Sequence, residues 1–125
     1  MLRAGAVALL VAAATALGPA GAATAQPVRH CRSADLRYPF QPGGPNDFGV
    51  FKLRITRGSC ATAHRVAKRW MDRFEADLRA GRVRLPRTVM GFRFTTLAPD
   101  AAQTYNERGR RGATTIRFDY VVPNG

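Results

Sequence analysis

Four residues of this 125-residue chain have side chains that commonly do chemistry: His30, Cys31, Cys60 and His64. A thiol beside an imidazole can form an activated nucleophile, and two histidines that converge on a phosphate with an arginine are what a basic ribonuclease requires. The only catalytic constellation that the spacing allows brings His30 towards His64. The sequence contains no nucleophile elbow, phosphate-binding loop or zinc-protease motif. We therefore expect no catalytic residue, no metal and no cofactor.

The two cysteines have a simpler explanation in an exported chain, which is one disulfide between Cys31 and Cys60. The alternatives are a metal site and a catalytic thiol, but neither C-x-x-C spacing nor a cluster of histidines supports them. On the chain-entropy view, a bridge that closes about 30 residues stabilises a domain by roughly 3 to 4 kcal/mol. The disulfide would therefore supply a large share of the stability of a small domain.

Residues 1–25 have the three parts of a secretory signal. They are a basic start at Arg3, an apolar run over 4–17 and a small-residue cleavage pattern over 23–25. The alternative is a retained membrane anchor, but the apolar run is shorter than the roughly 20 residues that a membrane span needs. We expect a mature chain that begins at Gln26, has no transmembrane anchor, and is secreted or associated with the cell envelope.

The chain is strongly basic, with 20 lysines and arginines against 8 acidic residues and a formal net charge of +12. Such a charge attracts polyanions. Lys52 and Lys68 are the only lysines, and this preference for arginine is also what a GC-rich genome imposes on any protein. Whether the arginines reflect function or genome composition, their charge attracts polyanions.

One long amphipathic helix is predicted between Gly58 and Gly81. Ser59 is a good N-cap, and Gly81 is typical of the residue that closes a helix. Apolar residues recur at three- and four-residue steps and form one stripe: Cys60, Ala63, Ala67, Trp70, Met71, Phe74 and Leu78. The opposite face carries Arg65, Arg69 and Arg73.

Alternation of apolar and polar residues predicts strands over 48–56, 89–97, 103–107 and 114–122. Gly91 suggests a bulge within the second strand, 98–100 a turn, 109–112 a hairpin tip, and 123–125 a frayed tail. Residues 26–47 are expected to form an irregular N-terminal arm, in which Leu36, Tyr38 and Phe40 lie on the core or add a short edge strand. The predicted fold is α+β, with one helix packed on an antiparallel sheet of about four strands in two layers and a single domain over 48–125.

The function expected from these features is binding at or outside the envelope, without catalysis. An anionic envelope polymer or a secreted protein is the expected partner. The candidate polyanion-binding residues are Arg65, Arg69, Arg73, Arg108, Arg110 and Arg111, with Arg93 and Arg117 on the sheet. A solvated exterior is the alternative for the helix arginines.

A protein-binding or inhibitor module that uses the loops at 39–47 and 106–112 is a second hypothesis, and a small basic nuclease-type hydrolase a third. Specific nucleic-acid recognition has no signature here, because Trp70, Phe74, Phe92 and Phe118 are all at inward positions and would not stack on bases.

The run from Ile55 to Trp70 reads G-S-C-x-x-A-x-x-V-A-x-x-W from Gly58 onward and is followed by Gly91-Phe92. It resembles the G-x-S-C-x-x-A-x-x-V-A-x-x-W motif of a group of small, uncharacterised secreted proteins that are common in actinobacteria. The resemblance implies a fold and a compartment, and no reaction. Phe94 and Tyr105 stand where that group often has two further cysteines, which leads to the hypothesis that these aromatic residues lie on neighbouring strands and fill the same space.

Overall fold

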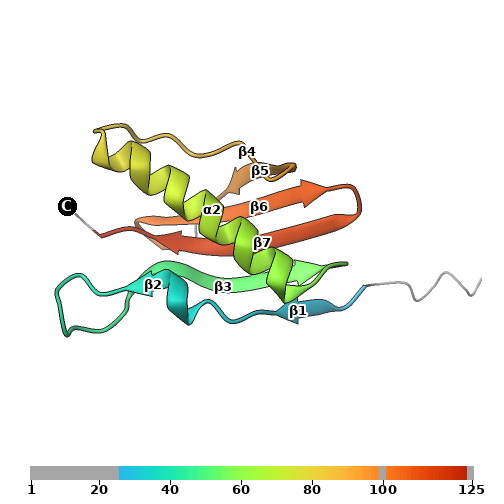
Figure 1. Cartoon of the computed structure of the whole chain (residues 1–125), viewed down its shortest axis with the longest axis horizontal. Coiled ribbons are helices and arrows are strands. Elements are labelled where there is room, and N and C mark those ends of the chain that lie inside the picture. Colours follow the sequence, from blue (N-terminus) through green and yellow to red (C-terminus); the bar gives the residue numbers. More distant parts are fainter. Residues whose placement is uncertain (1–25, 99–100, 124–125) are drawn as a thin grey trace, which may run out of the picture.

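One antiparallel sheet forms the first layer of the protein, and one long helix lies diagonally across it as the second (Figure 1). The computed structural model describes residues 26–98 and 101–123. The expected signal sequence, most of the predicted turn at 98–100 and the end of the predicted tail lie outside the described residues. The strands are β1 (Val28–His30), β2 (Arg37–Tyr38), β3 (Phe48–Thr56), β4 (Thr88–Val89), β5 (Phe92–Leu97), β6 (Thr104–Arg111) and β7 (Thr114–Val121), and the helix is α2 (Cys60–Arg79).

The α+β class is confirmed, but the sheet has seven strands and not about four. Its order is β1-β3-β7-β6-β5-β4, and β2 also pairs with β3. The arm that was predicted to be irregular contributes two short strands, because β1 and β2 both pair with β3. The short edge strand expected near Tyr38 is β2, and Leu36, just before it, is buried in the core, whereas Phe40 is exposed and outside both strands.

The predicted strand over 89–97 is wrong in its first half, where the chain makes a tight hairpin between β4 and β5. Met90 and Gly91 both have positive φ, at 51° and 82°. Two consecutive residues of this kind make the turn that joins two twisted strands directly. Met90 is consequently 48% exposed, although the alternation predicted that it points inward.

The predicted hairpin tip at 109–112 is also misplaced, because β6 continues to Arg111 and the turn follows at Gly112 and Ala113. Gly109 lies inside the strand, opposite Phe94 of β5. A Cβ on Gly109 would lie 2.5 Å from the end of the Phe94 ring, so the missing side chain makes room for that ring. Phe94 and Tyr105 are on neighbouring strands as predicted, but Tyr105 packs on Phe74 and the two do not fill a common space.

The helix begins and ends as its sequence predicts. The Ser59 hydroxyl accepts a hydrogen bond from the Thr62 amide at 3.1 Å, which satisfies one free donor of the first turn. At the other end Gly81 has φ 81°, and the Arg82 amide donates to the Asp77 carbonyl at 2.8 Å. This pairing is typical of a helix that closes on a left-handed glycine.

The apolar stripe of α2 packs on β3, β4 and β7, with Trp70 and Phe74 completely buried at its centre. Trp70 stacks on Phe74 at a centroid distance of 5.1 Å and meets Phe118 edge-on at 5.2 Å. The predicted disulfide between Cys31 and Cys60 is confirmed and joins the N-terminal arm to the first turn of the helix. Among the described residues, no helix is both long and apolar enough to span a membrane.

Candidate functional site

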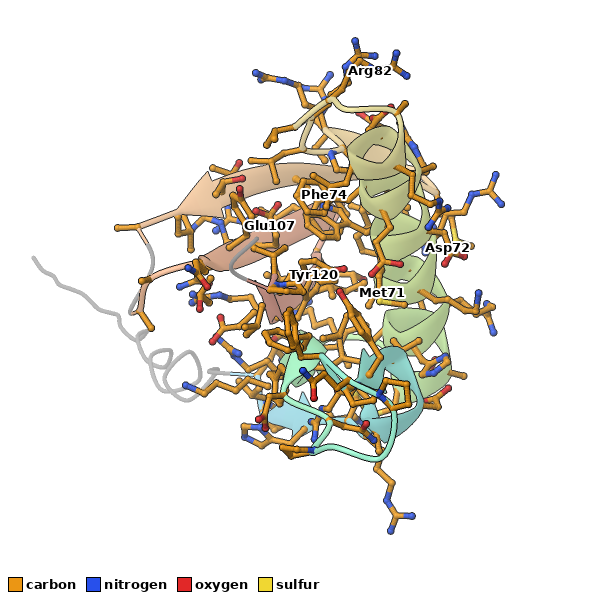
Figure 2. The ribbon with its side chains drawn as sticks, turned by 90° about the vertical axis from the view of Figure 1, so that its left-hand side faces the viewer. Met71, Asp72, Phe74, Arg82, Glu107 and Tyr120 are labelled. Carbon is orange, nitrogen blue, oxygen red and sulfur yellow. A yellow bond between two sulfur atoms is a disulfide. The ribbon has the colours of Figure 1, made fainter. Side chains whose placement is uncertain are left out.

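Helix α2 covers one face of the sheet, and no described helix covers the other, which we call the open face (Figure 2). Successive residues of a strand point to opposite faces. The buried Ile116, Phe118 and Tyr120 mark the helix side of β7. Arg117 and Asp119, which alternate with them, therefore belong to the open face.

Strand register gathers arginines on this open face. Arg54 of β3 lies opposite Arg117 of β7, and Arg117 lies opposite Arg108 of β6. Two residues along β6, Arg110 lies opposite Arg93 of β5. Since neighbouring strands are about 4.8 Å apart, the row of three arginines spans roughly 10 Å. Five guanidinium groups from four adjacent strands thus share one surface.

This arrangement is unfavourable for the isolated sheet, because like charges directly opposite each other on neighbouring strands destabilise the pairing. The acidic residues of the described strands are Glu107 and Asp119, and only Asp119 is on the open face. Like-charged side chains therefore face each other in register on this side of the sheet.

A pocket of about 400 Å³ lies on the open face where β1, β3, β7 and β6 meet. It is lined by His30, Lys52, Arg54, Asn106, Arg117 and Asp119. A bulge in β3 between Phe51 and Arg54 shapes its rim, and Lys52 has a positive φ of 56° there. Bulges of this kind redirect side chains, and Lys52 is thereby aimed at the pocket.

The floor of the pocket is polar and mostly buried. Asn106 and Asp119 are directly opposite each other in the register and are 8% and 6% exposed. Arg117 Nη2 donates to Asn106 Oδ1 at 3.1 Å, while the buried Arg117 Nε has no hydrogen-bond partner among the described residues. Lys52 Nζ lies 3.8 Å from Asp119 Oδ2, which is an ion pair but is too long for a hydrogen bond.

The structure divides the predicted polyanion-binding arginines between different surfaces. Arg108 and Arg110 are on the open face, and Arg65, Arg69 and Arg73 are exposed on the outer side of α2, as predicted. The helix and sheet arginines therefore cannot contact one flat surface together.

Arg111 is not grouped with its neighbours on β6. Its guanidinium lies 4.3 Å from the centre of the Phe92 ring and donates to the Met90 carbonyl at 3.0 Å, so it covers the edge of the core.

A second depression, of about 320 Å³, runs along the outer side of α2. It is lined by His64, Arg65, Lys68, Arg69, Asp72 and Met90. Its charges are partly balanced, because Lys68 pairs with Asp72 at 2.9 Å and His64 pairs with Asp35 at 2.7 Å. This surface therefore fits a solvated exterior better than the open face does.

The structure does not bring His30 and His64 together, since they line different pockets. His64 contacts a carboxylate, and His30 is exposed at the edge of the open face. Among the described residues, no cluster of three or more histidines, cysteines and acidic residues is placed to hold a metal ion.

The sequence reasoning missed a buried carboxyl group between the sheet and the helix. Glu107 is 1% exposed, and its Oε2 accepts a hydrogen bond from Thr96 Oγ1 at 2.6 Å (Figure 2). Burial raises the pKa of this carboxyl group above its ordinary value. Neither Glu107 Oε1 nor Trp70 Nε1 has a hydrogen-bond partner among the described residues. If the inward-facing positions of β7 are matched across the hairpin to β6, Glu107 falls on the side of the sheet that faces the helix.

A second polar contact that the sequence did not reveal joins the sheet to the helix. The Tyr120 hydroxyl donates to the Glu75 carboxylate, and the Tyr38 hydroxyl lies 3.4 Å from that of Tyr120. Burial, and then the neighbouring carboxylate, raise the pKa of Tyr120 above its ordinary value of 10.0. This network fixes the helix on the sheet and leaves the open face untouched.

Comparisons with protein-family models, with curated proteins and with solved structures find no match to this chain.

Proposed function

We propose that this protein is a secreted, non-catalytic binding module that holds an anionic polymer of the cell envelope or its surroundings against the open face of the sheet. One observation carries the proposal, which is the cross-strand alignment of arginines on that face. Guanidinium groups are well suited to phosphate and carboxylate because their planar donors can bind two oxygens at once.

The strength of such binding follows from the number of contacts. If five guanidinium groups each displace one counterion, the slope of log K against log salt is roughly −3.5, using the coefficient for single-stranded polyanions. The affinity would then fall by about a hundredfold between roughly 50 and 200 mM salt. A strong salt dependence alone would still reflect only the total charge.

A matched pair of variants separates the open face from total charge. Arg108→Gln with Arg110→Gln removes two charges from the open face, and Arg65→Gln with Arg69→Gln removes two from the outer side of α2. We expect the first pair to weaken binding to a polyanion at least tenfold and the second pair to weaken it less than threefold, since contacts matter more than distant charge. Equal losses in both pairs would refute the open face as the binding surface.

A protein-binding or inhibitor role is the second candidate, and one observation favours it. Phe40 is 63% exposed beside Phe48, in the loop between β2 and β3, next to a depression of about 340 Å³. An exposed aromatic side chain on a loop is a common anchor for a protein partner. Binding of one secreted protein that is insensitive to salt and is lost in Phe40→Ser would favour this role over polymer binding.

A further inference from the structure

The pocket at the centre of the open face is lined by a carboxylate as well as by basic side chains, which a simple cationic surface would not need. We propose that it binds a hydroxyl-bearing sugar unit of an acidic polysaccharide, with a sugar hydroxyl donating to Asp119 and the anionic group on the neighbouring arginines. This inference rests on the proposed function and specifies the chemical class of its ligand.

Asp119 makes the first distinction between ligands. It is 6% exposed, and its carboxylate lines the pocket. An ionised carboxylate can only accept hydrogen bonds, so a ligand group that touches it must be a donor. The phosphate or carboxylate of a ligand has acceptors only and is repelled there. A polymer that consists of anions alone therefore leaves Asp119 without a hydrogen-bond partner.

The neighbouring groups make the second distinction. Lys52 and Arg117, whose charged groups carry donors only, line the pocket beside Asp119. A ligand group that reaches these two side chains must be an acceptor. A hydroxyl group donates one hydrogen bond and accepts others, so it satisfies both kinds of partner at once. An ammonium group donates only, and it would be repelled by Lys52 and the arginines.

The size of the pocket and its surroundings fit a repeating unit. A volume of about 400 Å³ falls in the range that binds small molecules. Arg117 lines the pocket and is followed across the sheet by Arg108, with Arg110 and Arg93 in the next row. A chain with one unit in the pocket can therefore place the anionic groups of its other units on these arginines.

Asp119 could instead serve only as a counter-charge for Lys52, with which it is paired at 3.8 Å. The two roles predict different results when the carboxylate is removed. Loss of a counter-charge strengthens binding to every polyanion equally. Loss of a hydroxyl acceptor weakens binding only to polymers that have hydroxyl groups.

The test compares polygalacturonate with polyacrylate of the same number of carboxylates, because both are polycarboxylates and only the first has hydroxyl groups. The readout is the ratio of their affinities, in which the effect of net charge cancels. We expect the wild-type protein to prefer polygalacturonate by about tenfold, the value of one hydrogen bond to a charged group. Asp119→Leu should bring the ratio close to one, and Asp119→Asn, which keeps one acceptor, should lower it less.

Asp72→Asn is the matched control, since it removes the same charge from the outer side of α2 (Figure 2). It should raise the affinity for both polymers slightly and leave the ratio unchanged. Thermal unfolding of each variant shows whether it is folded, and the Asn variant keeps the test decisive if Asp119→Leu is unstable.

A wild-type ratio near one, or a ratio that survives in folded Asp119 variants, would overturn the sugar-binding inference while leaving the arginine surface in place. If neither polymer shows binding that weakens with salt, the proposed function would be overturned as well. The two failures are therefore distinguishable in one set of measurements.

Discussion

Gly109 lies between two arginines of the open face, and its own missing side chain faces the core. Replacing it with alanine tests how β6 is held in register. An added Cβ would lie 2.5, 2.7 and 2.9 Å from three carbons of the Phe94 ring, and that ring is 9% exposed and packs against Phe118. Overpacking of this kind costs about 1 to 3 kcal/mol.

A second effect has the opposite sign. In an unobstructed strand, alanine is more stable than glycine by about 0.5 to 1 kcal/mol. We therefore expect Gly109→Ala to lower the free energy of unfolding by up to about 2.5 kcal/mol, the largest difference between the two effects. Urea unfolding followed by the fluorescence of the buried Trp70 measures it directly.

The decisive comparison repeats Gly109→Ala in a Phe94→Leu background. Leucine lacks the outer ring carbons that the new Cβ would meet, so the cost of overpacking disappears and the substitution should become neutral or stabilising. Such a reversal of sign is a coupling between two residues in contact. An equal loss of stability in both backgrounds would show that the Phe94 ring is not what excludes a side chain at position 109.

Three further predictions concern the contacts that join the elements. Cys60→Ser should cost about 3.6 kcal/mol on the chain-entropy model, because the disulfide joins residues 29 positions apart, and addition of a reductant to the wild-type protein should reproduce most of that loss in urea unfolding. Glu107→Gln should stabilise the protein at neutral pH. Because the pKa of Glu107 is raised, the folded protein keeps a proton that the unfolded chain loses above about pH 4.5. The stability of the wild-type protein therefore falls as the pH rises from about 4.5 to the pKa of the folded state. Thermal unfolding of the variant should not show this decline. Tyr120→Phe should lower the free energy of unfolding by about 1.5 to 3 kcal/mol through loss of the hydrogen bond to the Glu75 carboxylate, and a change below about 0.5 kcal/mol would mean that this contact is not formed in solution.

Local patterns were sufficient to predict the elements that depend on neighbours in sequence. The helix followed from its cap at Ser59, its apolar stripe and its terminal Gly81, because capping and helical periodicity involve residues within one or two turns. The disulfide followed from the cysteine count in a chain that was expected to be exported. The alternation in β7 correctly placed Arg117 on the side away from the core. In β3 the same reasoning put Phe51 on one face with Leu53 and Ile55, but the bulge between Phe51 and Arg54 leaves Phe51 opposite Asp119, on the open face.

The turns were less accessible from the sequence. The hairpin at Met90 and Gly91 was mistaken for a bulged strand, because a methionine between apolar residues reads as part of an alternating run and its positive φ is imposed by the strands on either side. Gly109 was taken for a turn residue, although a ring from the neighbouring strand explains why it is glycine. In both cases the conformation is set by contacts with a neighbouring strand, and the periodicity of the local sequence does not reveal such contacts.

By itself the sequence determined the charge of the protein, its helix, its disulfide and the inward residues of β7. Only the tertiary structure decided which arginines act together. Alternation assigns the faces of one strand, but the alignment between strands depends on turn positions and bulges, and a shift by one residue moves every side chain to the opposite face. For this reason Arg54, Arg108 and Arg117, which are far apart in sequence, share a surface with Asp119, while Arg111, next to Arg110, lies on the other side of the sheet.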